Sequence, residues 1–235
     1  MKPYQTIPIL ECGEPLVPIP LEKFAIESPH PYEKLQAPYG EASPYFLRQS
    51  VLESLINAQA KLQQEYPGWR IQIFDAYRPV EVQQFMVDYT FAEIVREQKL
   101  NSAELSEQQQ EAIWQEVYKF WAAPTLNPMT PPPHSTGAVL DITLVDASGQ
   151  IVDMGSAIDE ISPRSYPDYY LNQPEFPYHR NRQLMHDVMY SVGFRRHPNE
   201  WWHFSLGDQM WAWLCNLENP RNTVIARYGR VAIDT

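Results

Sequence analysis

The sequence is poor in cysteine, in positive charge and in long apolar runs, and each shortage excludes a class of protein. Two cysteines, Cys12 and Cys215, are too few and too far apart for a disulfide framework. The 18 lysines and arginines face 29 acidic residues, and the net charge of -11 argues against a nucleic-acid or acidic-membrane partner, because phosphates attract basic surfaces. No stretch approaches the roughly 18 to 20 apolar residues that a membrane span needs. Internal repeats and low-complexity tracts are also missing.

A secretion signal is missing from the first ten residues as well. They carry one positive charge, and prolines interrupt an apolar run that is too short for a signal peptide. We therefore expect a cytoplasmic protein, although export by another route or earlier removal of a signal stays open. With 44% apolar residues and 13% aromatic residues, the chain can bury a proper core. Its acidic balance suits recognition of a cationic group such as a peptide amino terminus.

Proline dominates the beginning of the chain. We predict that residues 1–45 form an extended arm wrapped over a domain of residues 46–235. An apolar repeat of three and four residues predicts a helix that ends near Tyr66, and alternation predicts a strand over 69–75. Residues 80–122 are typical of helix, with a break near 100–102.

The second half of the chain mixes strands and helices. Residues 138–145 form the clearest predicted strand, and a long irregular stretch follows from 154 to about 178. Further elements are a strand at 151–153, a helix at 180–192, a strand at 199–206, a helix at 208–219 and a closing strand at 224–233. Without regular βαβ alternation, this order predicts a single α+β domain with a central antiparallel sheet flanked by helices.

The strand at 138–145 carries a carboxylate in an apolar setting. Side chains alternate between the faces of a strand, so Asp141 has hydrophobic neighbours and requires a cation or hydrogen-bond donors. His134 lies seven residues earlier, across a turn that Gly137 can relax, and its imidazole can fold back beside Asp141. A divalent metal would satisfy both side chains. The alternative is an aspartate that accepts backbone N–H bonds, with His134 on a surface loop.

A second carboxylate and imidazole, Glu200 and His203, stand in the segment Glu-Trp-Trp-His-Phe. A straight strand would point them to opposite faces, so the chain must bend if both serve one site. A catalytic zinc site needs such a pair, because an imidazole holds the metal and a carboxylate takes a proton from metal-bound water. The alternative is a structural strand packed by Trp201 and Trp202, in which His203 donates to a backbone carbonyl.

Two imidazoles and one aspartate would leave the fourth position of a tetrahedral zinc ion open to water, which is typical of catalytic sites. The remaining histidines have no comparable carboxylate at a suggestive spacing and are weaker candidates: His30, His179, His186 and His197. Arg78 follows a predicted strand, where an arginine can project into a site and bind an oxyanion with a fixed fork of donors. The alternative is an ordinary ion pair with Asp75 or Glu81.

These segments resemble the D-alanyl-D-alanine dipeptidase family of zinc metallopeptidases. That family is related to the zinc D-Ala-D-Ala carboxypeptidases and to the hedgehog signalling domain. The resemblance rests on four segments, which are Tyr-Arg-Pro at 77–79, His-Ser-Thr-Gly-Ala-Val-Leu-Asp at 134–141, Met-Gly-Ser-Ala-Ile-Asp at 154–159 and Glu-Trp-Trp-His at 200–203. Their order and spacing agree over roughly residues 45–230, which is most of the chain.

The resemblance implies a hedgehog/DD-peptidase-like fold and hydrolysis of D-alanyl-D-alanine, or a similar small dipeptide, to free amino acids. One zinc ion per chain would be the cofactor. The implied zinc ligands are His134, Asp141 and His203. Glu200 would be the general base that activates the zinc-bound water and then protonates the leaving amine. Arg78 would share the negative charge of the tetrahedral intermediate with zinc.

Asp159 would hold the free ammonium of the substrate. This would select dipeptides, because a longer chain would place an amide there and leave a buried carboxylate unpaired. The alternative is a solvated loop acid, and Glu160 beside it competes for the role. Two positions depart from the family pattern and bear on the dipeptide preferred. Pro132 stands where the family usually has a serine two residues before the histidine, and Val139 stands where alanine is usual.

Two other functions stay open. A zinc DD-carboxypeptidase that trims cell-wall peptides would use the same chemistry and would prefer amino-blocked or longer peptides. A non-hydrolytic zinc module would use the metal to stiffen a binding surface, and the presence of Glu200 and Arg78 argues against it. The expected partner is a small dipeptide substrate, with neither nucleic acid nor membrane. The sequence leaves the oligomeric state and the physiological role open.

Overall fold

The computed structural model describes residues 2–231. Its centre is a five-stranded sheet with the strand order β2-β4-β5-β7-β6. The pairs β4–β5, β5–β7 and β7–β6 are antiparallel, whereas the short pair β2–β4 is parallel. The strands are β2 (Ala25–Ile26), β4 (Arg70–Asp75), β5 (Val139–Val145), β6 (Arg195–Arg196) and β7 (His203–Ser205). The predicted α+β domain with a largely antiparallel central sheet is confirmed.

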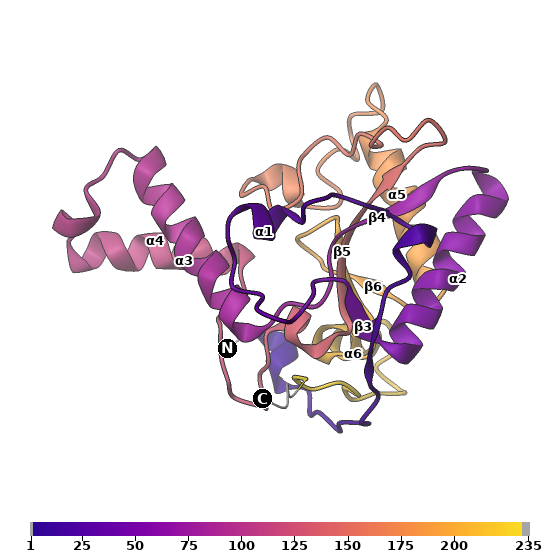
Figure 1. The fold of residues 1–235 in the computed structure, drawn as a ribbon, viewed down its shortest axis with the longest axis horizontal. Coiled ribbons are helices and arrows are strands. Elements are labelled where there is room, and N and C mark those ends of the chain that lie inside the picture. The colour runs from indigo at the N-terminus through magenta and orange to yellow at the C-terminus, as the bar shows by residue number, and fades with distance from the viewer. Residues whose placement is uncertain (1, 232–235) are drawn as a thin grey trace.

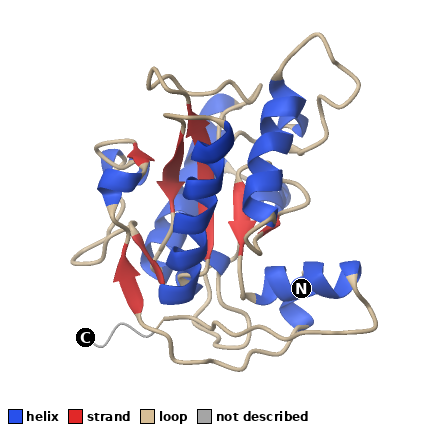
Figure 2. Ribbon diagram, turned by 90° about the vertical axis from the view of Figure 1, so that its right-hand side faces the viewer, coloured by secondary structure: helices blue, strands red, loops and turns tan. Residues whose placement is uncertain are grey.

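One face of the sheet packs against the two helices α2 (Gln49–Glu65) and α5 (Tyr178–Tyr190). Figure 1 shows both helices on the same side of β4 and β5, and Figure 2 shows helices lying against the sheet. Ile71, Ile73 and Leu140 alternate along their strands and are fully buried in this layer. The apolar repeat that predicted α2 is therefore the face that contacts the sheet.

The opposite face of the same strands is polar. Asp141 pairs with Asp75 of β4 on one side, where the register shifts, and with His203 of β7 on the other. All three side chains are buried. Because alternation sends Leu140, Ile142 and Leu144 to the helices, it leaves the carboxylate of β5 on the face where the site forms.

The predicted helical region forms two helices, α3 (Val80–Glu97) and α4 (Glu107–Phe120). The predicted break is real and contains the 3-10 turn η3 (Ser102–Glu104). Figure 1 shows this hairpin projecting from the body of the molecule. Its apolar cluster also includes Tyr32 and Tyr39, and α3 begins two residues after Arg78. No helix within residues 2–231 is long and apolar enough to cross a membrane.

The first part of the chain contributes several short elements. They are η1 (Pro3–Thr6), β1 (Leu16–Pro18), η2 (Leu21–Lys23), β2 and α1 (Pro31–Lys34). β1 pairs with β3 (Phe46–Arg48), β2 joins the central sheet, and the side chains of Phe24 and Tyr32 are buried. The division into an arm and a domain at residue 45 stays a prediction.

The last part of the chain departs from prediction in two places. The strand predicted at 199–206 is limited to β7, because the chain bends at residues 200–202. The closing strand predicted at 224–233 is wrong over its described part, and residues 232 and 233 lie outside the described residues. Residues 224–231 bond to separate segments instead: Ala226 forms an isolated bridge with Ile9, and Val231 N donates to Ser135 O. The helix predicted before it is α6 (Gln209–Glu218), and η5 (Pro163–Ser165) lies in the irregular stretch.

Candidate metal centre and its cavity

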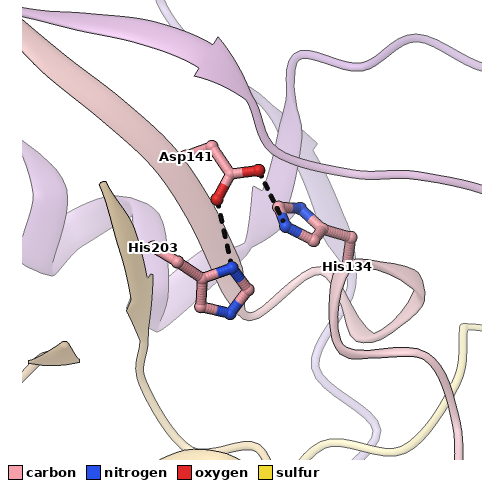
Figure 3. A group of neighbouring side chains, drawn as sticks. All are labelled: His134, Asp141 and His203. Carbon is pink, nitrogen blue, oxygen red and sulfur yellow. Dashed lines mark hydrogen bonds and ion pairs between the residues drawn. The ribbon is translucent and has the colours of Figure 1, made fainter. Parts of the chain in front are cut away.

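Three side chains from separate segments converge on one point (Figure 3). Asp141 lies in the middle of β5, His203 begins β7, and His134 lies in the 3-10 turn η4 (Pro133–Thr136). η4 ends at Gly137, whose φ of 69° is the left-handed conformation that glycine adopts without strain. Any side chain at that position would also clash with β1. The predicted turn at Gly137 therefore brings His134 back to Asp141.

The contacts between these residues require a cation. His134 Nδ1 donates to Ala76 O at 2.7 Å, so the Nε2 atom of the neutral ring carries a lone pair. That Nε2 atom faces Asp141 Oδ2 at 3.1 Å, and two acceptors at this distance repel unless a proton or metal lies between them. Burial lowers the pKa of His134, but the Asp141 carboxylate outweighs burial and the pKa lies above its ordinary value. Burial raises the pKa of Asp141, but the two imidazoles more than reverse this effect.

The donor set fits zinc. His203 Nδ1 lies 3.1 Å from Asp141 Oδ1, and the donor atoms of all three residues lie within 4.8 Å of one another. Tetrahedral zinc with bonds of about 2.0 to 2.1 Å separates its ligands by roughly 3.3 Å, close to the N–O distances seen here. His203 Nε2 is buried without a hydrogen-bond partner among the described residues. Three protein ligands leave the open position that catalytic zinc sites keep.

Glu200 stands beside these ligands because the chain bends before β7, as the sequence required. Its Oε2 atom lies 3.5 Å from His203 Nδ1, and its side chain is 11% exposed. Burial raises the pKa of Glu200 to about 7, and the nearby His203 only partly offsets this rise. A carboxyl group of this kind can both take up and release a proton near neutral pH.

Arg78 is buried against the same cavity and is held on several sides. Its Nε and Nη2 atoms donate to Asp75 Oδ2 at 2.9 and 2.7 Å, and Nη1 donates to Gln83 Oε1 at 2.9 Å. Nη2 also lies 3.1 Å from the Tyr32 hydroxyl and 3.5 Å from Asp141 Oδ2. The ion pair with Asp75, which was the alternative interpretation of Arg78, is therefore present, and it fixes the guanidinium beside the metal ligands.

Asp159 reaches the cavity from the irregular stretch between β5 and α5. Its φ of 62° is unusual for a residue other than glycine. The Tyr32 hydroxyl donates to Asp159 Oδ2 at 2.6 Å. Burial, and next the charge of Asp141, raise the pKa of Asp159 to about 6. A group that brings its own positive charge would therefore be well placed beside this carboxylate.

The cavity also contains residues that sequence reasoning missed. His197, which had been set aside, lines it with its Nδ1 atom 3.8 Å from Glu200 Oε1, and Lys2 and Tyr4 line it from the amino-terminal segment. His197 stands three residues before Glu200, and this spacing was an available signal. Lys2 gave no signal in the sequence, since it lies 198 positions before Glu200 and no motif connects the two. His30, also set aside, lies behind the cavity with Nε2 3.3 Å from Asp75 Oδ1.

The two departures from the family pattern lie next to the cavity. Pro132 precedes η4, and its carbonyl oxygen accepts a bond from Ser135 Oγ at 2.7 Å. Val139 is fully buried opposite Ser205 of β7. Neither is among the residues that line the cavity.

Comparison with known proteins places the chain among peptidases. Residues 26–223 match a family described as D-ala-D-ala dipeptidase. A D-alanyl-D-alanine dipeptidase of Synechocystis is 53% identical over 240 residues, which cover 98% of this chain and 97% of that relative. The enzyme of the same name from Escherichia coli is 42% identical over 73 residues, covering 31% of this chain and 37% of the relative. The D-alanyl-D-alanine dipeptidase of Enterococcus faecium is 34% identical over 77 residues, which cover 32% of this chain and 37% of that relative.

The overlap with solved structures is weaker. The vancomycin resistance D,D-pentapeptidase VanY in complex with Zn(II) aligns with a TM-score of 0.45 and 16% identity, covering 74% of this chain and 80% of that chain. The LD-carboxypeptidase LdcB aligns with a TM-score of 0.47 and 15% identity, covering 90% of this chain and 75% of that chain. These values are too low to carry an argument about the site, which depends on the geometry above and on the sequence relatives.

Proposed function

Because the chain belongs to the D-alanyl-D-alanine dipeptidase family, we propose that it cleaves D-alanyl-D-alanine with zinc held by His134, Asp141 and His203 and with Glu200 as general base. The products are two molecules of D-alanine. One observation carries the assignment of residues. A pair of buried imidazoles and a carboxylate surround a position that requires a cation, and a second carboxylate, Glu200, lines the same cavity 3.5 Å from His203.

Glu200 moves the proton in this scheme. Zinc, when bound, supplies a Lewis acid that polarises a carbonyl and makes water acidic near neutral pH. Glu200 accepts the proton of the attacking water and then delivers it to the nitrogen of the departing D-alanine. Its buried position serves the first step, because burial raises the pKa of the carboxyl group and makes the carboxylate a better base.

Arg78 stabilises the negative charge that develops on the scissile carbonyl oxygen. The contacts with Asp75 and Gln83 hold the guanidinium in place before the substrate arrives. A fixed cation in a buried site stabilises charge better than one that must first be ordered. The Arg78 charge also lies beside Asp141, so it completes the cationic side of the cavity.

Asp159 binds the free ammonium group of the substrate. Its carboxylate lines the cavity and shares a hydrogen bond with Tyr32, which in turn accepts one from Arg78. A blocked amino group would leave the Asp159 carboxylate desolvated and without a cation, at a cost of about 1 to 3 kcal/mol. This cost gives preference to a dipeptide with a free amino terminus.

A zinc-loaded assay of the full chain tests these proposals. We expect release of D-alanine from D-alanyl-D-alanine, loss of this activity with EDTA, and its return with added zinc. N-acetyl-D-alanyl-D-alanine should be a poor substrate. Preference for the acetylated peptide would identify a carboxypeptidase instead. A protein that binds zinc stoichiometrically but cleaves neither peptide would be a binding module.

The proposal also covers the partners of the protein and its location in the cell. A net charge of -11 is the support for a protein without a nucleic-acid or acidic-membrane partner, and the cytoplasm is its expected location. Fractionation of the native cells would test the location.

A further inference from the structure

The cavity is rich in carboxylates, which would repel the carboxylate of a free dipeptide. Asp141, Asp159 and Glu200 all line it. A free dipeptide carries a carboxylate on its second residue as well as an ammonium group on its first. Without a cation for the substrate carboxylate, the acidic lining would repel it and burial would strip its water. The cavity therefore needs a positive group besides the metal for this end of the substrate.

Arg78 is assigned to the scissile carbonyl oxygen and is held there, so it does not reach the other end of the substrate as well. Each nitrogen of its guanidinium already donates to a protein acceptor, on Asp75, Gln83 or Tyr32. Moving the guanidinium toward a distant carboxylate would leave the Asp75 carboxylate, which is fully buried, without its strongest partner. Among residues 2–231, the lysines and arginines that line the cavity are Arg78 and Lys2. Lys2 remains.

Lys2 is held at the cavity by the amino-terminal turn. It precedes η1, its backbone N–H donates to Gln5 Oε1 at 2.8 Å, and the neighbouring Tyr4 side chain is 4% exposed. Gln209 at the start of α6 anchors this segment, because its Nε2 atom donates to Ile7 O at 2.6 Å. The backbone around Lys2 is thus fixed by contacts from the opposite end of the chain.

Among residues 2–231, Lys2 forms no ion pair with a carboxylate, and Glu200 is the carboxylate whose charge acts on its ammonium group. Burial lowers its pKa, and the charge of Glu200 offsets this only in part. A half-buried ammonium without a close partner is a group that an anionic ligand would satisfy.

His197 also lines the cavity. The Asn199 backbone N–H donates to His197 Nδ1 at 3.2 Å, so the proton of the neutral ring is on Nε2. Lys2, His197, Glu200 and Asp159 line one cavity. The acid that binds the ammonium group is hydrogen-bonded to the Tyr32 hydroxyl, whereas Glu200 lies beside His203 and His197.

We propose that Lys2, with His197 beside it, forms the subsite that binds the free carboxylate of the substrate's second residue. The proposal rests on the proposed function and deepens it. Asp159 binds the ammonium group of the substrate and Lys2 binds its carboxylate, so the enzyme prefers a dipeptide with both ends free. The carboxylate keeps its charge throughout the reaction, so Lys2 contributes to binding in the ground state and the transition state alike.

Kinetics with D-alanyl-D-alanine test this subsite in the zinc-loaded full chain. Lys2→Met removes the charge and keeps an unbranched side chain, and we expect KM to rise about tenfold with kcat within about twofold. Lys2→Arg should restore most of the affinity. Lys119→Met is the matched control, because Lys119 is exposed on α4 and does not line the cavity, and it should leave KM unchanged.

Inhibition by D-alanine and by D-alaninamide separates a carboxylate contact from a structural role. The wild type should bind D-alanine more tightly than the amide, and Lys2→Met should lose this preference. Equal weakening of both inhibitors would show that Lys2 merely holds the amino-terminal segment and would overturn the proposal. An unchanged KM with a lower kcat and a shifted pH profile would also overturn the proposal. That result would show that Lys2 acts on the pKa of Glu200 and does not bind the substrate carboxylate.

The outcome for the subsite is distinguishable from that for the proposed function. If the wild type does not cleave D-alanyl-D-alanine, the proposed function fails before any variant is compared. If the wild type cleaves it and Lys2→Met behaves like Lys119→Met, the subsite alone fails. Thermal melting of each variant accompanies the kinetics. Lys2→Gln replaces Lys2→Met in both measurements if the latter melts well below the wild type.

Discussion

The two sides of the cavity are built in different ways. The metal side is carried by the sheet and a tight turn: Asp141 and His203 are register partners in adjacent strands, and Gly137 returns His134 to them. The substrate side is carried by irregular segments, where Asp159 is held by one hydrogen bond from Tyr32. A hydrogen-bonded ladder fixes a side chain more firmly than a loop does.

This difference assigns the chemical step to the metal side of the cavity and the selectivity for peptides to the substrate side. Residues on the metal side bind one shared ion, so removing any ligand weakens metal binding by all of them. Loss of the metal then leaves the buried Asp141 carboxylate without its cation. Residues on the substrate side act one at a time on the ends of the peptide. We expect changes on the metal side to abolish activity and changes on the substrate side to alter which peptide is cleaved.

The largest effect should come from His203→Ala. Removing one of three ligands should reduce bound zinc from about one per chain toward zero and abolish cleavage. Metal analysis of the purified variant measures this. The control is His186→Ala, because His186 lies on α5 and contacts Asp187 rather than the cavity. Full zinc content in His203→Ala would show that the ligand set is different.

Glu200→Gln should separate chemistry from metal binding on the same side of the cavity. We expect zinc to remain near one per chain while kcat falls by about 10³, because the amide cannot accept the proton of the attacking water. Stopped assays with zinc analysis on the same sample measure both quantities. Turnover close to that of the wild type would assign the base to another residue.

Asp159→Asn should alter selectivity with a smaller loss of activity. Losing a charged partner for the ammonium should lower kcat/KM for D-alanyl-D-alanine by about 30-fold and narrow the gap to the N-acetylated peptide. Glu160→Gln is the matched control, since Glu160 pairs with Arg164 at 2.8 Å outside this cavity. If the control loses selectivity and Asp159→Asn keeps it, the roles of these neighbours are exchanged.

The smallest effect should be on the stability of the zinc-free protein. Burial raises the pKa of Glu200 from 4.5 to about 7, so folding favours its protonated form. The stability it contributes is present below about pH 4.5 and is lost as the pH rises through about 7. Between pH 5 and 8 the wild type should lose about 2 kcal/mol relative to Glu200→Gln in urea unfolding. Parallel curves would show that Glu200 does not have the raised pKa, and added zinc should reduce the difference.

The sequence determined the parts of the site that depend on local order. Alternation in β5 placed Asp141 on the face away from the apolar core, and Gly137 predicted the turn that returns His134. The spacing of Glu200 and His203 required a bend, and the chain bends there. These features follow from periodicity and backbone conformation within a few residues, which a sequence displays directly.

Tertiary structure alone decided the remaining features. The bond from Gln209 to Ile7 joins residues 202 positions apart, and it brings Lys2 to the cavity. Residues 224–231 have a strand-like pattern but lie against several segments and form no ladder among the described residues. Such contacts depend on which surfaces remain uncovered once the sheet and helices have packed. Local propensity contains no information about that choice, because the partners are chosen by burial and hydrogen bonding across the whole fold.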